Sequence, residues 1–270
     1  MSEISQIKAP IVDAHFHTWR LDHPLTGTAW HAPPSDAPID EFIRLMDKHG
    51  IIFGVVAAAS IFGEYNDYVR AAIAAHPRLR ATAVLSPKTD IRQMERMKEE
   101  GFVGVRLMWA FNETNPDLES GEYRMFLRRV ADLGWHVHLV AKPEVYVPAI
   151  RILEKSGVRL VIDHMGDMKK RKFVDSPGFR EILAAVDRGN TWVKVSCKFR
   201  FEPPDEADFF AEKLIRAAGG DRILWGSDWP FAAFEGKVTY DRVLEDYYHL
   251  VPDAEMRRRI DETALRFYFT

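Results

Sequence analysis

The length and composition of the chain favour one enzyme-sized globular unit. The 270 residues suffice for one large domain but not for two, and 47% of them are hydrophobic, which allows a sizeable core. The formal net charge is −3, with charges of both signs interspersed along the chain. This balance gives no reason to expect nucleic acid or an anionic membrane as a partner.

The cysteine content and the apolar segments indicate the cellular compartment of the protein. Cys197 is the one cysteine in the sequence, which excludes an intrachain disulfide and a structural zinc site with two or more cysteines. Residues 1–10 lack the apolar region of a secretory signal, and no apolar stretch reaches the roughly 18 residues that a membrane span needs. We therefore expect a soluble, cytoplasmic protein with a small-molecule partner, while its oligomeric state stays open.

Short apolar segments alternate with longer amphipathic ones along the whole chain. Apolar segments rich in Val, Ile and Leu predict strands at residues 11–14, 52–59, 80–85, 103–108, 136–140, 159–162, 192–196 and 222–225. Amphipathic segments predict helices at residues 40–49, 64–75, 90–100, 120–133, 144–155, 176–188, 204–218, 240–249 and 254–267. This order predicts parallel strands joined by right-handed crossovers. We expect an α/β fold, a single-domain (β/α)8 TIM barrel over residues 1–270.

An open, doubly wound sheet is the alternative arrangement for this order of elements. A nucleotide-binding sheet would carry Gly-x-Gly-x-x-Gly after its first strand, where the pyrophosphate must approach the backbone. The first predicted strand is followed instead by His15-Phe16-His17. The sequence therefore favours the closed barrel.

Two loops could take part in function. Residues 18–38 form the longest irregular stretch near the start, and they could act as a lid or simply cover the barrel mouth. Residues 169–172 form the basic block Lys169-Lys170-Arg171-Lys172. Such a block is typical of a solvated loop but could also gather an anionic substrate.

Polar side chains follow several predicted strands at their carboxyl ends, where barrel active sites lie. His15 and His17 are two residues apart, so on a strand they share one face and could ligate a divalent metal or bind an anionic substrate. His164 could polarise a carbonyl or accept a proton, unless it is a structural histidine. Asp228 is placed to act as a general base, the alternative being a helix N-cap.

The sequence resembles the amidohydrolase superfamily, in the branch called amidohydrolase family 2. Within that branch it is most similar to the lactonases that include 2-pyrone-4,6-dicarboxylate lactonase. The matching stretches follow the family's order over nearly the whole chain: Val12-Asp13-Ala14-His15-Phe16-His17, Gly104-Val105-Arg106-Leu107, Gly134-Trp135-His136-Val137, Val161-Ile162-Asp163-His164-Met165-Gly166, Trp192-Val193-Lys194-Val195-Ser196 and Leu224-Trp225-Gly226-Ser227-Asp228-Trp229-Pro230. The resemblance implies a lactone ring that is opened by water.

The resemblance also implies roles for single residues. Asp228 would deprotonate the hydrolytic water, and His164 together with the His-x-His pair would polarise the ester carbonyl. Arg106 would bind a substrate carboxylate through its planar guanidinium, and Arg200 would be a second carboxylate-binding arginine. For both arginines the alternative is a surface or inter-helix ion pair. Ser60 could donate a hydrogen bond to the substrate or be a plain turn serine.

One departure from the family pattern concerns the metal. Metal-dependent members carry a histidine ligand on the fifth strand, where this chain has Val140, and His138 should lie one layer deeper. The set His15, His17 and Asp228 could still hold an ion. We therefore expect either no required cofactor or one divalent metal ion, most plausibly zinc.

A second departure concerns the substrate. After Asp-His-Met-Gly the lactonases carry an arginine, and this chain has Asp167. After Ser-Asp-Trp-Pro they carry a polar pair, and this chain has Phe231-Ala232. An acidic residue in place of a carboxylate-binding arginine indicates a lactone or carboxylate substrate that is less anionic than the dicarboxylate.

Two other functions stay open beside the lactonase. The same branch contains metal-dependent non-oxidative decarboxylases of aromatic or unsaturated carboxylic acids, and the missing histidine counts against that chemistry. A catalytically silent barrel used for binding is the alternative from another class. The histidines and the aspartate at the strand ends argue against it, because together they form a complete acid–base set.

Overall fold

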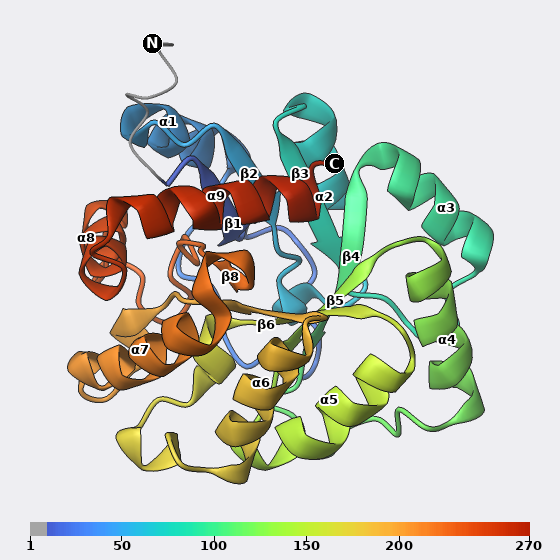
Figure 1. The fold of residues 1–270 in the computed structure, drawn as a ribbon. Coiled ribbons are helices and arrows are strands. Elements are labelled where there is room, and N and C mark those ends of the chain that lie inside the picture. The colour runs from blue at the N-terminus through green and yellow to red at the C-terminus, as the bar shows by residue number, and fades with distance from the viewer. Residues whose placement is uncertain (1–9) are drawn as a thin grey trace.

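The computed structural model describes residues 10–270. Eight parallel strands form one sheet in chain order, and helices surround it (Figure 1). The strands are β1 (Val12–Phe16), β2 (Phe53–Val56), β3 (Leu79–Ala83), β4 (Phe102–Met108), β5 (His136–Val140), β6 (Arg159–Ile162), β7 (Thr191–Lys194) and β8 (Ile223–Leu224). The α-helices are α1 (Ile39–His49), α2 (Asp67–Ala75), α3 (Ile91–Glu100), α4 (Gly121–Asp132), α5 (Tyr146–Lys155), α6 (Pro177–Arg188), α7 (Ala207–Ala218), α8 (Tyr240–Leu250) and α9 (Ala254–Tyr268).

Backbone hydrogen bonds between β1 and the segment after β8 bring the two ends of the sheet together. The Ala14 amide donates to the carbonyl of Trp225 at 2.9 Å, and the Asp228 amide donates to the carbonyl of His15 at 2.8 Å. Gly226 permits this approach, because a Cβ atom there would lie 2.5 Å from the Cβ of His15. The predicted (β/α)8 barrel is confirmed.

Helix α9 closes the end of the barrel where the strands begin. The Asp261 carboxylate accepts hydrogen bonds from the amides of Ile11, at 3.0 Å, and Val12, at 3.2 Å. A compact apolar cluster joins strand and helix residues at this end: Val12, Ala14, Val55, Val161, Leu224, Ala264, Phe267 and Tyr268. The opposite end, where the strands finish, is left for the functional site. Among the described helices, none combines the length and the apolar character that crossing a membrane requires.

Most predicted elements are present, with shifts at their ends. The predicted strands 136–140 and 159–162 coincide with β5 and β6. The first strand was expected to end at residue 14 but continues to Phe16, so His15 lies inside β1. The second is shorter than predicted, because the chain leaves the sheet after Val56; Ser60 therefore does not end a strand but begins a short 3-10 helix, Ser60–Phe62.

Candidate active site

A cavity that opens to solvent lies at the carboxyl ends of the strands. The predicted loop 18–38 supplies two of its aromatic walls, Trp19 and Trp30, and Trp30 stacks on Phe111 with ring centroids 4.4 Å apart. The cavity is lined by His17, Trp19, Trp30, Ala59, Ser60, Ile61, Arg106, Met108, Ala110, Phe111, Val140, His164, Asp167, Lys169, Arg200, Asp228 and Ala232. Apolar walls with a few charged groups are typical of small-molecule sites.

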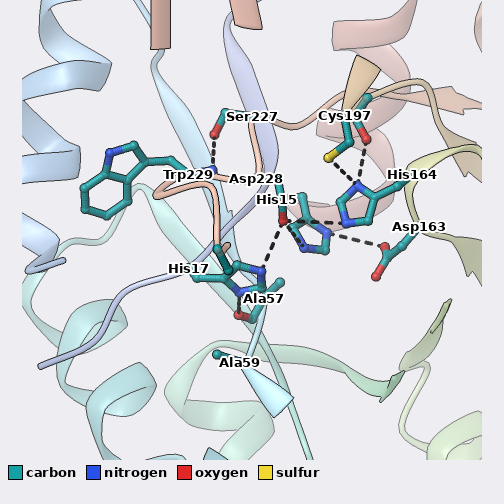
Figure 2. Close-up of polar contacts among 12 residues, drawn as sticks. His15, His17, Ala57, Ala59, Asp163, His164, Cys197, Ser227, Asp228 and Trp229 are labelled. Atoms are coloured by element: carbon teal, nitrogen blue, oxygen red, sulfur yellow. Dashed lines mark hydrogen bonds and ion pairs between the residues drawn. The ribbon is translucent and has the colours of Figure 1, made fainter. Parts of the chain in front are cut away.

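Asp228 lies at the centre of the polar groups in this cavity. Its Oδ1 is 3.2 Å from Nε2 of His17, 3.6 Å from Nε2 of His15 and 3.6 Å from Nε2 of His164 (Figure 2). Its Oδ2 accepts a hydrogen bond from Nη2 of Arg200 at 2.6 Å. Arg200 and the histidines His164 and His17 hold the pKa of Asp228 well below the usual range despite its burial. The carboxylate is therefore ionised at neutral pH.

The backbone at two of these residues adopts the left-handed conformation. Asp228 has φ 64° and His164 has φ 52°. Such backbone angles are unfavourable for residues other than glycine and gather at functional sites. His164 lies two residues after the end of β6 and Asp228 four residues after the end of β8, and both side chains line the cavity.

Hydrogen bonds to neighbouring groups fix the histidine rings. Nδ1 of His17 lies 2.6 Å from the carbonyl oxygen of Ala57, and it must donate because a carbonyl only accepts. Nδ1 of His164 contacts Oγ of Ser196 at 2.9 Å and Sγ of Cys197 at 3.0 Å (Figure 2). Burial lowers the pKa of His164 to about 4, so this imidazole is neutral at pH 7. Each ring thus presents Nε2 to Asp228.

Arg106, which the sequence singles out as a substrate-binding residue, lines the cavity but already has protein partners. Its Nε donates to Oδ2 of Asp163 at 3.1 Å, and its Nη1 donates to the carbonyl of Ala58 at 3.2 Å. Ser60, the third predicted substrate contact, also lines the cavity and accepts a long hydrogen bond from Nε1 of Trp30 at 3.4 Å. The site residues proposed from the sequence therefore line one cavity, except His15, which is fully buried beside Asp228.

The basic block at residues 169–172 divides between cavity and solvent. Lys169 lines the cavity and lies 3.2 Å from Oδ2 of Asp167, whereas Lys170, Arg171 and Lys172 are exposed. Burial raises the pKa of Asp167, and Lys169 opposes that change. Asp167 thus has its own counter-ion.

Sequence reasoning missed three buried charged residues beneath the cavity. Lys194 on β7 is fully buried with Nζ 3.0 Å from Oδ1 of Asp163. Asp13 on β1 accepts from the Ser227 amide at 2.9 Å and from the Tyr240 hydroxyl at 2.9 Å, which braces the two strands that carry the central histidine and aspartate. The sequence does carry a signal for these residues, because each is a charged residue in an apolar stretch. Lys194 and Asp13 lie inside predicted strands, and Asp163 directly follows one.

The match to known families decides the classification of this barrel. The family model described as amidohydrolase matches residues 12–270. The chain belongs to the amidohydrolase family.

Relatives of this amidohydrolase act on lactones. The 4-sulfomuconolactone hydrolase of Hydrogenophaga intermedia is 27% identical over 263 residues, covering 92% of this chain and 84% of the relative. The 2-pyrone-4,6-dicarboxylate hydrolase of Comamonas testosteroni is 26% identical over 289 residues, covering 98% and 92%. A solved Acinetobacter baumannii structure, a candidate 2-pyrone-4,6-dicarboxylic acid hydrolase with citric acid bound, aligns with a TM-score of 0.90 and 27% identity over 97% of this chain and 100% of that one. These relatives support a hydrolase.

This amidohydrolase has side chains that could hold a metal ion. Within residues 10–270, three sets bring possible ligand atoms within 4.8 Å of one another: His15, His17 and Asp228; His15, Asp163 and His164; His164, Cys197 and Asp228. Val140 provides no ligand from β5, although it lines the cavity. A catalytic zinc usually needs three protein ligands. The first set therefore reaches that number only if Nε2 of His15 offers a free electron pair.

Proposed function

We propose that this amidohydrolase opens a lactone ring with a water molecule that Asp228 activates. The observation that carries this proposal is the position of Asp228: one oxygen is held by Arg200, while the other faces three imidazoles at the edge of the cavity. A carboxylate that stays ionised and is fixed in direction is suited to take a proton from water.

The proposed reaction needs only the groups at the barrel mouth. Asp228 takes one proton from water as the oxygen forms a bond to the lactone carbonyl carbon. Imidazole N–H groups stabilise the negative charge that develops on the carbonyl oxygen. The bond from that carbon to the ring oxygen then breaks, and the ring oxygen takes the proton from Asp228. The product is an open-chain hydroxy acid, released as its carboxylate, and Asp228 is again ionised.

The charges around the cavity support a substrate with one carboxylate rather than two. Arg106 and Lys169 are the cations that face the cavity beside Arg200, whose Nη2 and Nε bind Asp228. Lys169 is neutralised by Asp167. Arg106 keeps part of its guanidinium free, because only Nε and Nη1 make hydrogen bonds to protein. We therefore assign the substrate carboxylate to Arg106 and a supporting role to Arg200.

The test is Asp228→Asn, assayed on whichever substrate emerges from a panel of sugar, muconate and pyrone lactones. The amide cannot accept the proton, so kcat should fall by about 10³-fold or more while the melting temperature changes little. Asp167→Asn is the matched control, because it removes a carboxylate from the same cavity and should alter KM more than kcat. A rate near that of the wild type in Asp228→Asn would refute Asp228 as the base.

A further inference from the structure

The barrel interior holds a lysine that the reaction above does not use. Lys194 on β7 is fully buried, and its Nζ lies 2.7 Å from Nδ1 of His15, 3.0 Å from Oδ1 of Asp163 and 3.2 Å from Nδ1 of His138. An ammonium group has three protons, and a buried one is costly unless each finds an acceptor. Here Nζ is within hydrogen-bond distance of two imidazole nitrogens and forms an ion pair with one carboxylate oxygen.

This contact determines which nitrogen of His15 carries a proton. Nδ1 of His15 lies 2.7 Å from Nζ of Lys194 and 3.4 Å from Oδ1 of Asp163. A lysine ammonium can only donate, so at the shorter contact Nδ1 presents its electron pair. The proton of the neutral ring is therefore on Nε2, which lies 3.6 Å from Oδ1 of Asp228. A doubly protonated His15 would place an N–H against the ammonium. Burial and Lys194 both lower the pKa of His15, which agrees with a neutral ring.

His17 shows the opposite arrangement in the same site. Its Nδ1 donates to the carbonyl of Ala57 at 2.6 Å, which leaves Nε2 as the nitrogen with an electron pair when the ring is neutral. Nδ1 therefore carries a proton in His17 and none in His15, so the two histidines of the His-x-His pair differ at this nitrogen.

We propose that Lys194 is a positioning residue that keeps His15 protonated on Nε2, so that the buried His15 ring directs an N–H towards Oδ1 of Asp228, the proposed base. The inference rests on the proposed lactone hydrolysis for its catalytic consequence, but not for the tautomer. The proposal also bears on metal binding by His15, His17 and Asp228. A protonated Nε2 of His15 cannot be a ligand, so His17 and Asp228 alone would remain as ligands from this set.

Asp163 connects Lys194 and His15 to the substrate-binding side of the cavity. Its Oδ1 binds Lys194 and its Oδ2 binds Arg106. Lys194 and His15 hold the pKa of Asp163 well below the usual range although burial opposes this. Asp163 thus keeps Lys194 charged and also orients Arg106, the residue to which we assign the substrate carboxylate.

The first experiment reads the tautomers directly in the wild-type protein. Long-range ¹H–¹⁵N correlation NMR distinguishes protonated from bare imidazole nitrogens, with the signals assigned by His15→Asn and His17→Asn. We expect a bare Nδ1 and a protonated Nε2 for His15, and in the same sample a protonated Nδ1 for His17. A protonated Nδ1 in His15 would overturn the proposal, whatever the activity of the protein.

The second experiment replaces the lysine. Lys194→Met keeps most of the side-chain volume and removes the donor, so kcat should fall by about 10–100-fold with little change in KM. The matched control is Lys198→Met: Lys198 is also buried, but it binds Asp205 at 3.2 Å and Asp208 at 2.5 Å instead of a histidine. A folded Lys194→Met with the wild-type kcat would overturn the catalytic role.

The two experiments separate this inference from the proposed function. If no lactone is hydrolysed but His15 is protonated on Nε2, the proposed function fails and the tautomer assignment stands. If lactones are hydrolysed and His15 is protonated on Nδ1, the assignment fails alone. Should Lys194→Met not fold, the wild-type spectrum still decides the assignment.

Discussion

The side chain of Arg200 makes two hydrogen bonds to one oxygen of Asp228, from Nη2 at 2.6 Å and from Nε at 3.0 Å. This cation lowers the pKa of Asp228, whereas burial alone would raise it. Arg200→Met should therefore raise that pKa. Since the base must be ionised, the acid side of the kcat/KM profile should move to higher pH.

A second cation in the same cavity provides the control for this shift. Lys169 is paired with Asp167 rather than with the proposed base. In Lys169→Met the acid side of the profile should stay where it is in the wild type. If Arg200→Met leaves the profile in place as well, another group limits the rate at low pH.

At the scale of secondary-structure elements, Asp261 attaches helix α9 to the start of β1. Burial raises the pKa of Asp261 to about 7, compared with about 3.9 for an unfolded chain. Between these values the folded protein binds a proton that the unfolded chain does not, so this group's contribution to stability falls as the pH rises from about 4 to about 7. Above pH 7 the buried carboxylate is ionised and this contribution is lost.

Asp261→Asn should remove that pH dependence and keep the attachment. The amide oxygen can still accept from the amides of Ile11 and Val12, and no charge is buried. At about pH 8 the melting temperature should rise by about 2–4 °C, or about 1 kcal/mol, and at about pH 4 it should match the wild type. Glu255→Gln, which removes an exposed carboxylate from the same helix, should not reproduce this pattern. An equal change at both pH values would show that Asp261 does not titrate as argued.

The order of the elements could be predicted from the sequence, but some of their ends and partners could not. Period and composition place β5 and β6 at their observed bounds, because Val, Leu and Ile make up most of each segment. They cannot show that β1 continues to Phe16, which depends on the partner segment after β8. They also give no role to Lys194, because its partners His15 and Asp163 lie on other strands. The two-residue spacing of His15 and His17 at a strand end did identify this pair from the sequence.

At the scale of the whole molecule, Asp163 and Asp228, the buried carboxylates at the barrel mouth, already have cationic partners. Lys194 and Arg106 compensate Asp163, and Arg200 compensates Asp228. A divalent cation bound by His15, His17 and Asp228 would contact the carboxylate of Asp228, which already binds the guanidinium of Arg200. Electrostatics therefore disfavour tight metal binding in this arrangement.

The protein stripped with a strong chelator should accordingly hydrolyse its lactone at the wild-type rate. Metal content and activity are measured on the same sample, before and after chelation and after zinc is added back. We expect substoichiometric metal before treatment and no gain in rate from zinc. Tightly bound stoichiometric zinc or manganese, with activity lost on removal, would contradict the charge argument. It would favour the metal-dependent decarboxylase, because carbanion chemistry on an acid relies on a Lewis acid more heavily than ester hydrolysis with an ionised base does.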